Sequence, residues 1–176
     1  MEVKKGGGGM EAASPIDEKA MTREEKLLYL YVGGKADVYE QKWGKGRFSW
    51  NWAAFIFGLF WLGYRKMYVP LLVILGLFLL FDAAAYLMGD FEASWDFGIG
   101  FVVSAVLGIG GNQLYRQDAE RKIRKIQTSH RPEHVETAVM KKGGAGFVSL
   151  LLGFLLLLAY GLITGALSVF MEWMYL

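Results

Sequence analysis

Apolar residues gather after Phe48 into long runs with almost no charge, whereas the first 47 residues are mostly polar. Three of these runs are long enough to cross a bilayer, and they cover residues 69–88, 97–114 and 143–171. A helix needs about 20 residues, within a range of roughly 17–25, to cross the hydrocarbon core. The pattern therefore predicts an all-α integral membrane protein with a three-span membrane domain over residues 69–176.

The aromatic stretch that precedes these runs, FSWNWAAFIFGLFWLGYRKMY over residues 48–68, has a different character. Its strictly apolar part, residues 53–64, would be about 18 Å long as a helix at about 1.5 Å per residue. The hydrocarbon core is about 30 Å thick. On length alone, this stretch is too short to span cleanly.

The distribution of charge predicts an orientation, because cytoplasmic flanks collect Lys and Arg. The loop at 89–96 holds three carboxylates and no cation, so we expect it outside. The loop at 115–142 is basic, so we expect it in the cytoplasm. Its cations are Arg116, Arg121, Lys122, Arg124, Lys125, Arg131, Lys141 and Lys142. The N-terminus would then be cytoplasmic and the C-terminus outside.

Both flanks of the aromatic stretch are basic, with Lys42, Lys45 and Arg47 before it and Arg65 and Lys66 after it. Two cytoplasmic ends exclude a single crossing, so the charges predict an interfacial helix or a re-entrant hairpin. Four full spans with the N-terminus outside remain the alternative. Aromatic side chains favour the headgroup level. The expected membrane-interface residues are Trp50, Asn51, Trp52, Trp61, Tyr64, Arg65, Lys66 and Tyr68.

The N-terminal part divides into a glycine-rich segment, residues 1–21, that we expect to be disordered, and a segment at 22–47 with two short amphipathic helices. Thr22 and Glu25 have the spacing of a capping box at the start of the first helix. Such short helices need another surface to fold on, either the membrane or the rest of the protein.

Small residues repeat every four positions in two of the predicted spans. Gly100, Ser104 and Gly108 form one such stripe, and Gly161 and Gly165 form another. Small residues at this spacing let membrane helices approach closely. We expect both stripes to pack against helices of this chain or of another subunit.

Asp82 is the one ionisable side chain inside a predicted span, so a transport or proton-relay role is one hypothesis for it. His130 and His134 are four residues apart, but Pro132 between them blocks a continuous helix. The chain has no cysteine and none of the common catalytic motifs. We therefore expect no catalytic residues, no metal site and no cofactor, and thus no enzyme.

The stretch after the second span, YRQDAERKIRKIQ, has the pattern of an amphipathic helix that extends that span. Asp118–Lys122 and Glu120–Arg124 have the i,i+4 spacing of supporting ion pairs. One apolar side is expected from Tyr115, Ala119, Ile123 and Ile126. The basic face has two interpretations, a charge run that sets topology and a surface for anionic lipid.

Four stretches carry a family resemblance: YVGGKADVYEQKW, SWNWAAFIFGLFWLGYRKMY, GNQLYRQDAERKIRKI and the KKGG before the last apolar run. Together, over about residues 31–146, they resemble a bacterial membrane-protein family catalogued as domain of unknown function 2628. The block at residues 51–68 is the most specific part. The resemblance implies a multi-pass protein of the bacterial inner membrane, and it implies no activity.

We therefore expect a small non-enzymatic membrane protein that is a scaffold, an assembly factor or an accessory subunit of a larger complex. Its expected partners are the lipid bilayer and a membrane protein or a second copy of itself. A net charge of +2 gives no reason to expect nucleic acid. The alternatives are a homo-oligomeric transporter or channel that uses Asp82, and a lipid sensor at the membrane surface.

Overall fold

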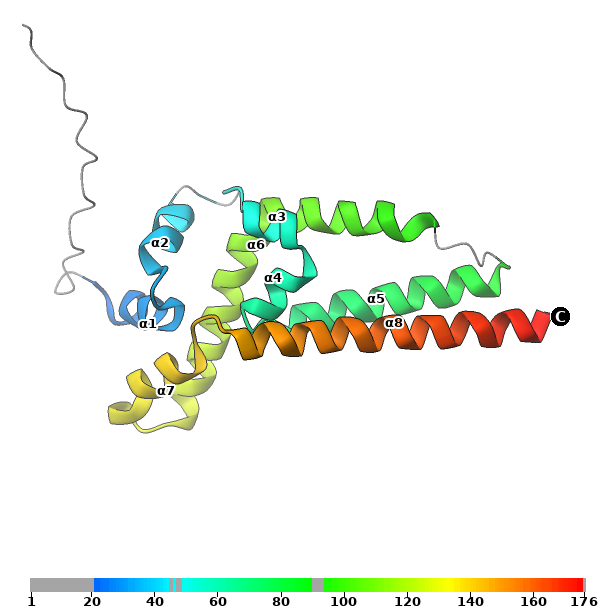
Figure 1. Ribbon diagram of the computed structural model, residues 1–176. Helices are drawn as coiled ribbons and strands as arrows, with labels where there is room; N and C mark the ends of the chain where they lie inside the picture. The colour runs from blue at the N-terminus through cyan, green and yellow to red at the C-terminus, as the bar shows by residue number, and fades with distance from the viewer. Residues whose placement is uncertain (1–20, 45, 47–48, 90–93, 176) are drawn as a thin grey trace, which may run out of the picture.

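The computed structural model describes residues 21–44, 46, 49–89 and 94–175, and every regular element among them is a helix (Figure 1). Three helices are long and apolar enough to cross a membrane, at Tyr68–Leu87, Gly98–Ser129 and Phe147–Met174. This confirms the predicted all-α class and the number of candidate spans. Of the N-terminal segment expected to be disordered, all but Met21 lies outside the described residues, as do residues 90–93 of the acidic loop.

Two short helices, α1 (Arg23–Val32) and α2 (Ala36–Gly44), open the described chain. The predicted capping box is present, because Thr22 accepts from the Glu25 backbone and the Glu25 carboxylate accepts from the Thr22 backbone. Gly33, with a φ of 71°, ends α1. Glycine adopts a positive φ at little energetic cost, because it has no Cβ atom.

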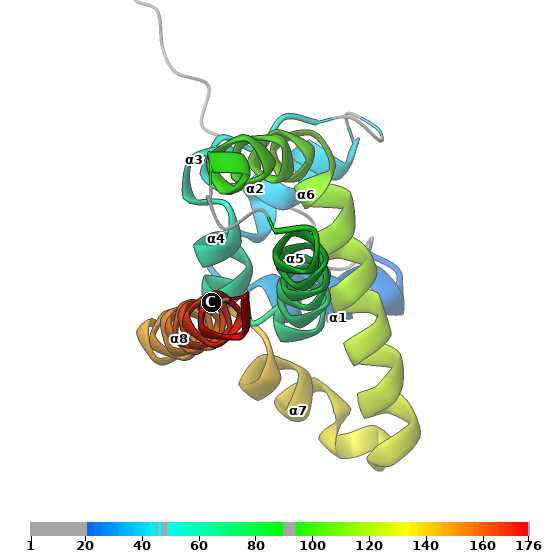
Figure 2. The same ribbon diagram turned by 90° about the vertical axis from the view of Figure 1, so that its right-hand side faces the viewer.

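The aromatic stretch forms a helical hairpin, α3 (Trp52–Phe57) followed by α4 (Leu59–Tyr64). Gly58, with a φ of 48°, separates the two helices, and each is only about 9 Å long at about 1.5 Å per residue. Helix α3 packs against α6 and helix α4 against α8, as Figures 1 and 2 both show. The stretch therefore forms two short helices and not one continuous helix, and its interfacial or re-entrant placement in a membrane stays a prediction.

Three long helices follow, α5 (Tyr68–Leu87), α6 (Ser94–Ser129) and α8 (Phe147–Tyr175). Helix α6 bends, so that its first part points in roughly the same direction as α5 and α8 but lies apart from them, while its second part leads toward α1, α2 and α7 (Figures 1 and 2). The predicted amphipathic extension is confirmed, since its expected apolar side is buried. The exposed fractions there are 0% for Tyr115 and Ala119, 5% for Ile123 and 8% for Ile126.

One predicted ion pair on this extension is wrong. Asp118 and Lys122 do pair, at 2.6 Å, but Glu120 bonds Arg116 at 2.9 Å instead of Arg124. Both candidate partners of Glu120 are four residues away, and spacing alone does not choose between them. After α6, Pro132 begins the short 3₁₀ helix η1 (Pro132–His134), which leads into α7 (Val135–Lys142). Proline at a helix start needs no backbone donor.

Helices α4 and α8 cross closely at two glycines that the sequence analysis did not single out. A Cβ built on Gly63 would lie 2.8 Å from the Gly153 Cα, and the converse distance is also 2.8 Å. Real Cβ atoms do not approach backbone so closely, so both positions need glycine. Small residues at membrane helix crossings commonly have this role.

Gly63→Ala should therefore destabilise the fold by about 1–3 kcal/mol, because the new methyl group forces α4 and α8 apart. Gly76→Ala in α5 is the matched control, since nothing lies within 4 Å of a Cβ there. The control should be neutral or slightly stabilising, because alanine favours helix over glycine. Thermal unfolding in detergent measures both effects, and equal melting temperatures for the two variants would contradict the close crossing.

Candidate functional site

Both ends of the α3–α4 hairpin are fixed to α6 by buried polar contacts. At the first end, the Asn51 backbone donates to the Gly108 carbonyl at 2.7 Å, and the Asn51 amide donates to Asn112 at 2.8 Å. Asn112 in turn donates to the carbonyl and the hydroxyl of Ser49. Asn51 and Asn112 are only 1% and 2% exposed. Asn51 also caps α3 by accepting from the Ala54 backbone.

Arg65, at the other end of the hairpin, is buried among aromatic rings and is 3% exposed. Its guanidinium carbon lies 4.5 Å from the ring centre of Tyr39 on α2 and 5.0 Å from that of Tyr115 on α6. In the described part of the chain, no carboxylate lies within ion-pair distance of it. Its charge is therefore balanced by cation–π contacts, which are stronger when desolvated.

The rings around Arg65 form an aromatic cluster that joins α1, α2, α4 and α6. Tyr39 and Tyr115 lie 4.9 Å apart between ring centres, and Trp61 meets Tyr115 edge-on at 6.3 Å. Burial raises the pKa of Tyr39, although the Arg65 guanidinium opposes part of that rise. Burial also raises the pKa of Tyr31, and Tyr115 and Asp118 add to the shift. Both phenols thus stay neutral well above physiological pH.

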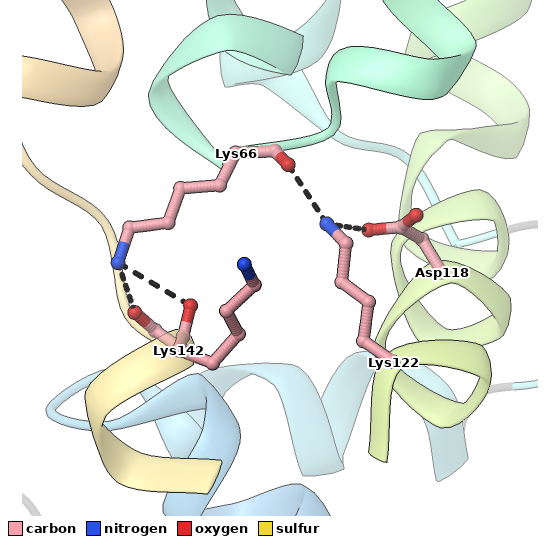
Figure 3. A network of polar contacts seen from close by, with 5 residues as sticks. Lys66, Asp118, Lys122 and Lys142 are labelled. Atoms are coloured by element: carbon pink, nitrogen blue, oxygen red, sulfur yellow. Dashed lines mark hydrogen bonds and ion pairs between the residues drawn. The ribbon is translucent and has the colours of Figure 1, made fainter. Parts of the chain in front are cut away.

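Lys66, the residue after Arg65, links three separate parts of the chain (Figure 3). Its carbonyl accepts from the Lys122 ammonium on α6 at 2.7 Å, and Lys122 also pairs with Asp118. The Lys66 ammonium donates to the Gly143 carbonyl in the α7–α8 connection. Its pKa is lowered by burial and by the nearby Lys122 and Lys142 cations. Lys66 has a φ of 59°, the one positive non-glycine φ among the described residues.

Gly143 and Gly144 lie next to Lys66 and pack against the end of α1. We call this region, with the α3–α4 hairpin and the facing part of α6, the corner. The Gly144 backbone donates to the Tyr31 carbonyl at 2.6 Å. A Cβ on Gly143 would collide with that same carbonyl. The KKGG motif therefore has a structural explanation: the two glycines let the start of α8 meet α1 while Lys66 holds the Gly143 carbonyl.

The structure brings only some of the predicted site residues together. Asn51, Trp61 and Arg65 are buried, whereas Trp50 is 38% and Trp52 is 65% exposed. Tyr64, Lys66 and Tyr68 are half-buried. None of these placements tests contact with lipid, so the interface assignments stay predictions.

The two predicted small-residue stripes behave differently. In α6, Gly108 packs against Phe55 and Trp50, and Ser104 lies against Gly58 of the hairpin. A Cβ on Gly100, Gly161 or Gly165 would meet nothing within 4 Å. Among the described residues, only the second half of the α6 stripe therefore packs against another helix.

Asp82 lies inside the helix pair α5–α8 and is 8% exposed. Its carboxylate accepts a 2.7 Å hydrogen bond from the Tyr160 hydroxyl on α8. His130 and His134 are both exposed at the end of α6 and in η1. The described residues contain no group of three or more His, Asp or Glu side chains placed to hold a metal ion.

The polar groups around the hairpin connect helices to one another. From the sequence, Tyr115 and Asp118 were named for other reasons, and Asn112 was not singled out. Asn112, Tyr115 and Asp118 all lie in the GNQLYRQDAERKIRKI stretch and face the hairpin or α1. An asparagine at the end of an apolar run was the available signal. The arrangement is suited to holding the hairpin rigidly at one end of the long helices.

Asn112→Leu should lower the free energy of unfolding by about 2–4 kcal/mol, because the amide of Asn51 and the carbonyl of Ser49 lose buried hydrogen bonds. Gln113→Leu is the matched control, since it makes the same exchange at the next residue of α6, which is half-buried. Chemical unfolding of the detergent-solubilised protein measures both. A loss at position 112 no larger than at position 113 would contradict the buried network.

Comparison with known proteins gives one match. A family model described as "Protein of unknown function (DUF2628)" matches residues 17–121. The match includes the hairpin, Arg65, Lys66 and Asn112, and it ends before the KKGG motif. No curated protein and no solved structure matches the chain.

Proposed function

The chain belongs to the DUF2628 family, as its motifs predicted, and we propose that it is a non-enzymatic membrane protein that serves a larger membrane complex. Its role there would be that of a scaffold, an assembly factor or an accessory subunit. The polar groups of the corner support this proposal, because Asn51, Asn112 and Lys66 are occupied by contacts between helices.

The observation that carries the proposal is the unpacked small-residue stripe on α8. Gly161 and Gly165 are exposed, and a Cβ at either would meet open space. Glycine inside a helix costs about 1 kcal/mol relative to alanine. A stripe of glycines thus destabilises the isolated helix, and close packing of another helix against the stripe would offset that loss. Leu158 and Val169 lie on the same side of α8, three residues before Gly161 and four after Gly165. They are 48% and 67% exposed and would widen the contact.

We further propose that the protein lies in the bacterial inner membrane with its N-terminus in the cytoplasm and its C-terminus outside. The helices α1, α2 and α7 and the second part of α6 would form a cytoplasmic domain. The α3–α4 hairpin would enter the membrane from that side and return. The charge distribution supports this orientation, and both ends of the hairpin contact α6, through Asn51 and Lys66.

The contact of Asp82 favours a structural role over the transport alternative. Its carboxylate is bonded to Tyr160 across α5 and α8, so it joins two helices of the same chain. A carboxylate in a span is costly unless a partner satisfies it. Here a phenol on the neighbouring helix supplies that partner, and the pair needs no second subunit.

Because the chain has no cysteine, single-cysteine variants can test the orientation without background labelling. Met88→Cys, where the native side chain is 79% exposed, should react with an impermeant maleimide in intact cells. Thr137→Cys on α7 should react only after the inner membrane is permeabilised. Phe57→Cys at the hairpin tip should stay unlabelled from both sides, because the thiol would lie in hydrocarbon. Labelling of Thr137→Cys in intact cells would invert the topology, and external labelling of Phe57→Cys would establish a fourth span.

Substitution of the α8 stripe tests the proposed association. Gly161→Ile with Gly165→Ile should reduce the yield of cross-linked or copurified membrane partner by about tenfold or more, because the added side chains block close helix approach. Ala159→Ile with Ala166→Ile is the matched control, since both alanines are exposed and the helical repeat places them on a different side of α8 from the glycines. The control should retain the partner. An equal yield from both double variants would remove the support for this surface.

A further inference from the structure

A basic cavity of about 720 Å³ lies between α5, α6 and α7, and it adjoins the Lys66–Lys122 contact described above. Five cationic side chains line it: Arg121, Lys122, Lys125, Lys141 and Lys142. The first three come from α6 and the last two from the final turn of α7. The cavity is thus built from elements that are distant in the sequence and that the fold brings together.

The cavity carries a large excess of positive charge. The one carboxylate in its lining is Asp118, which is already bonded to Lys122. In the described part of the chain, Arg121, Lys125 and Lys141 have no carboxylate within ion-pair distance. With five cations against one carboxylate, the lining has a net charge of +4 when His130 is neutral.

The lysines at the inner edge of this cavity are crowded. Figure 3 shows the Lys142 ammonium in the space bordered by Lys66 and Lys122. Lys122 and Lys142 both contribute to the lowered pKa of Lys66, after burial. Crowded cations repel one another, and an anion bound among them would relieve that repulsion.

The position of the cavity selects the kind of anion. Val69 lines the cavity and belongs to the first turn of α5, so the basic lining meets the end of a candidate span. From Val69, exposed apolar side chains continue along the same face of α5. Val69, Leu72 and Val73 are 57%, 51% and 57% exposed. A soluble anion would leave these apolar side chains uncovered. A phospholipid has a charged headgroup for the cavity and an acyl chain that would cover them.

We propose that this cavity binds the phosphate headgroup of an anionic phospholipid, with an acyl chain lying along the Val69 face of α5. Four lining cations, Arg121, Lys125, Lys141 and Lys142, have no ion pair among the described residues. Arg121, Lys125 and Lys141 would contact the phosphate oxygens, and Lys142 would stay at the inner edge beside Lys66 and Lys122. Basic pockets at the ends of membrane helices are suited to such headgroups. The inference does not depend on the scaffold proposal, since a bound lipid is compatible with any role of the protein.

The test uses the full chain in a neutral detergent, titrated with phosphatidylglycerol and followed by native mass spectrometry. Phosphatidylcholine with the same acyl chains is the neutral lipid, and glycerol phosphate is the soluble headgroup. We expect the first phosphatidylglycerol to bind about tenfold or more tightly than phosphatidylcholine. Glycerol phosphate should compete weakly. Competition by glycerol phosphate as strong as that by the lipid would overturn the lipid assignment in favour of a free anion.

The triple variant Arg121→Gln, Lys125→Gln, Lys141→Gln should bind phosphatidylglycerol roughly 100-fold more weakly, since each cation near the membrane surface contributes about a factor of five. The matched control removes the same charge at exposed positions outside the cavity lining. It is Arg23→Gln, Arg124→Gln, Arg131→Gln, which should stay within about threefold of the wild type. An equal loss in both triple variants would show a diffuse charge effect and overturn the site.

Ser129→Trp tests the cavity without a change of charge. Ser129 is exposed at the end of α6 and lines the cavity, so an indole there would fill space that the headgroup needs. We expect about tenfold weaker binding of phosphatidylglycerol with unchanged helicity. Binding equal to that of the wild type would overturn the proposal, even where the triple variant fails to fold.

Discussion

Short helices have terminal backbone groups that need partners outside the helix, and this constraint organises the α3–α4 hairpin and the helices around it. The α3–α4 hairpin has four helix ends within about a dozen residues. Asn51 caps the first end, and its own backbone donates to the Gly108 carbonyl. At the last end, the Lys66 carbonyl accepts from Lys122. The hairpin is stable because α6 supplies a partner at each end, and α6 bends in a way that brings these partners to it (Figure 1).

The two cations after the hairpin, Arg65 and Lys66, make different kinds of contact, although they are adjacent in the sequence. Arg65 is desolvated, and its planar guanidinium is suited to lie against the rings of Tyr39 and Tyr115. Lys66 uses a compact ammonium to reach the Gly143 carbonyl. Lysine in place of Arg65 would lose the planar contact and keep the burial cost. The sequence pair Arg-Lys is therefore not simply two positive charges that hold a segment at one face.

The sequence predicted the features that depend on local pattern. The long apolar runs predicted α5, α6 and α8, and the spacing of Thr22 and Glu25 predicted the start of α1. The local pattern could not predict the features that depend on contacts between distant residues. The crossing of Gly63 and Gly153 joins residues 90 positions apart, and no local period marks either glycine. Likewise, spacing alone could not choose between the two arginines that are four residues from Glu120.

Local pattern also could not predict how the charged side chains are arranged in space. For this reason the basic loop has two interpretations from its sequence, although it has one arrangement in the fold. The membrane orientation depends only on how many cations the loop contains, and it does not depend on where their side chains point. In the fold, five of the eight cations in residues 115–142 line one cavity. Of the other three, Arg116 is paired with Glu120. Setting topology gives no reason for cations of α6 and α7 to converge, since mutual repulsion disfavours it. An anion held at the base of α5 accounts for that convergence, and it leaves the count that sets topology unchanged.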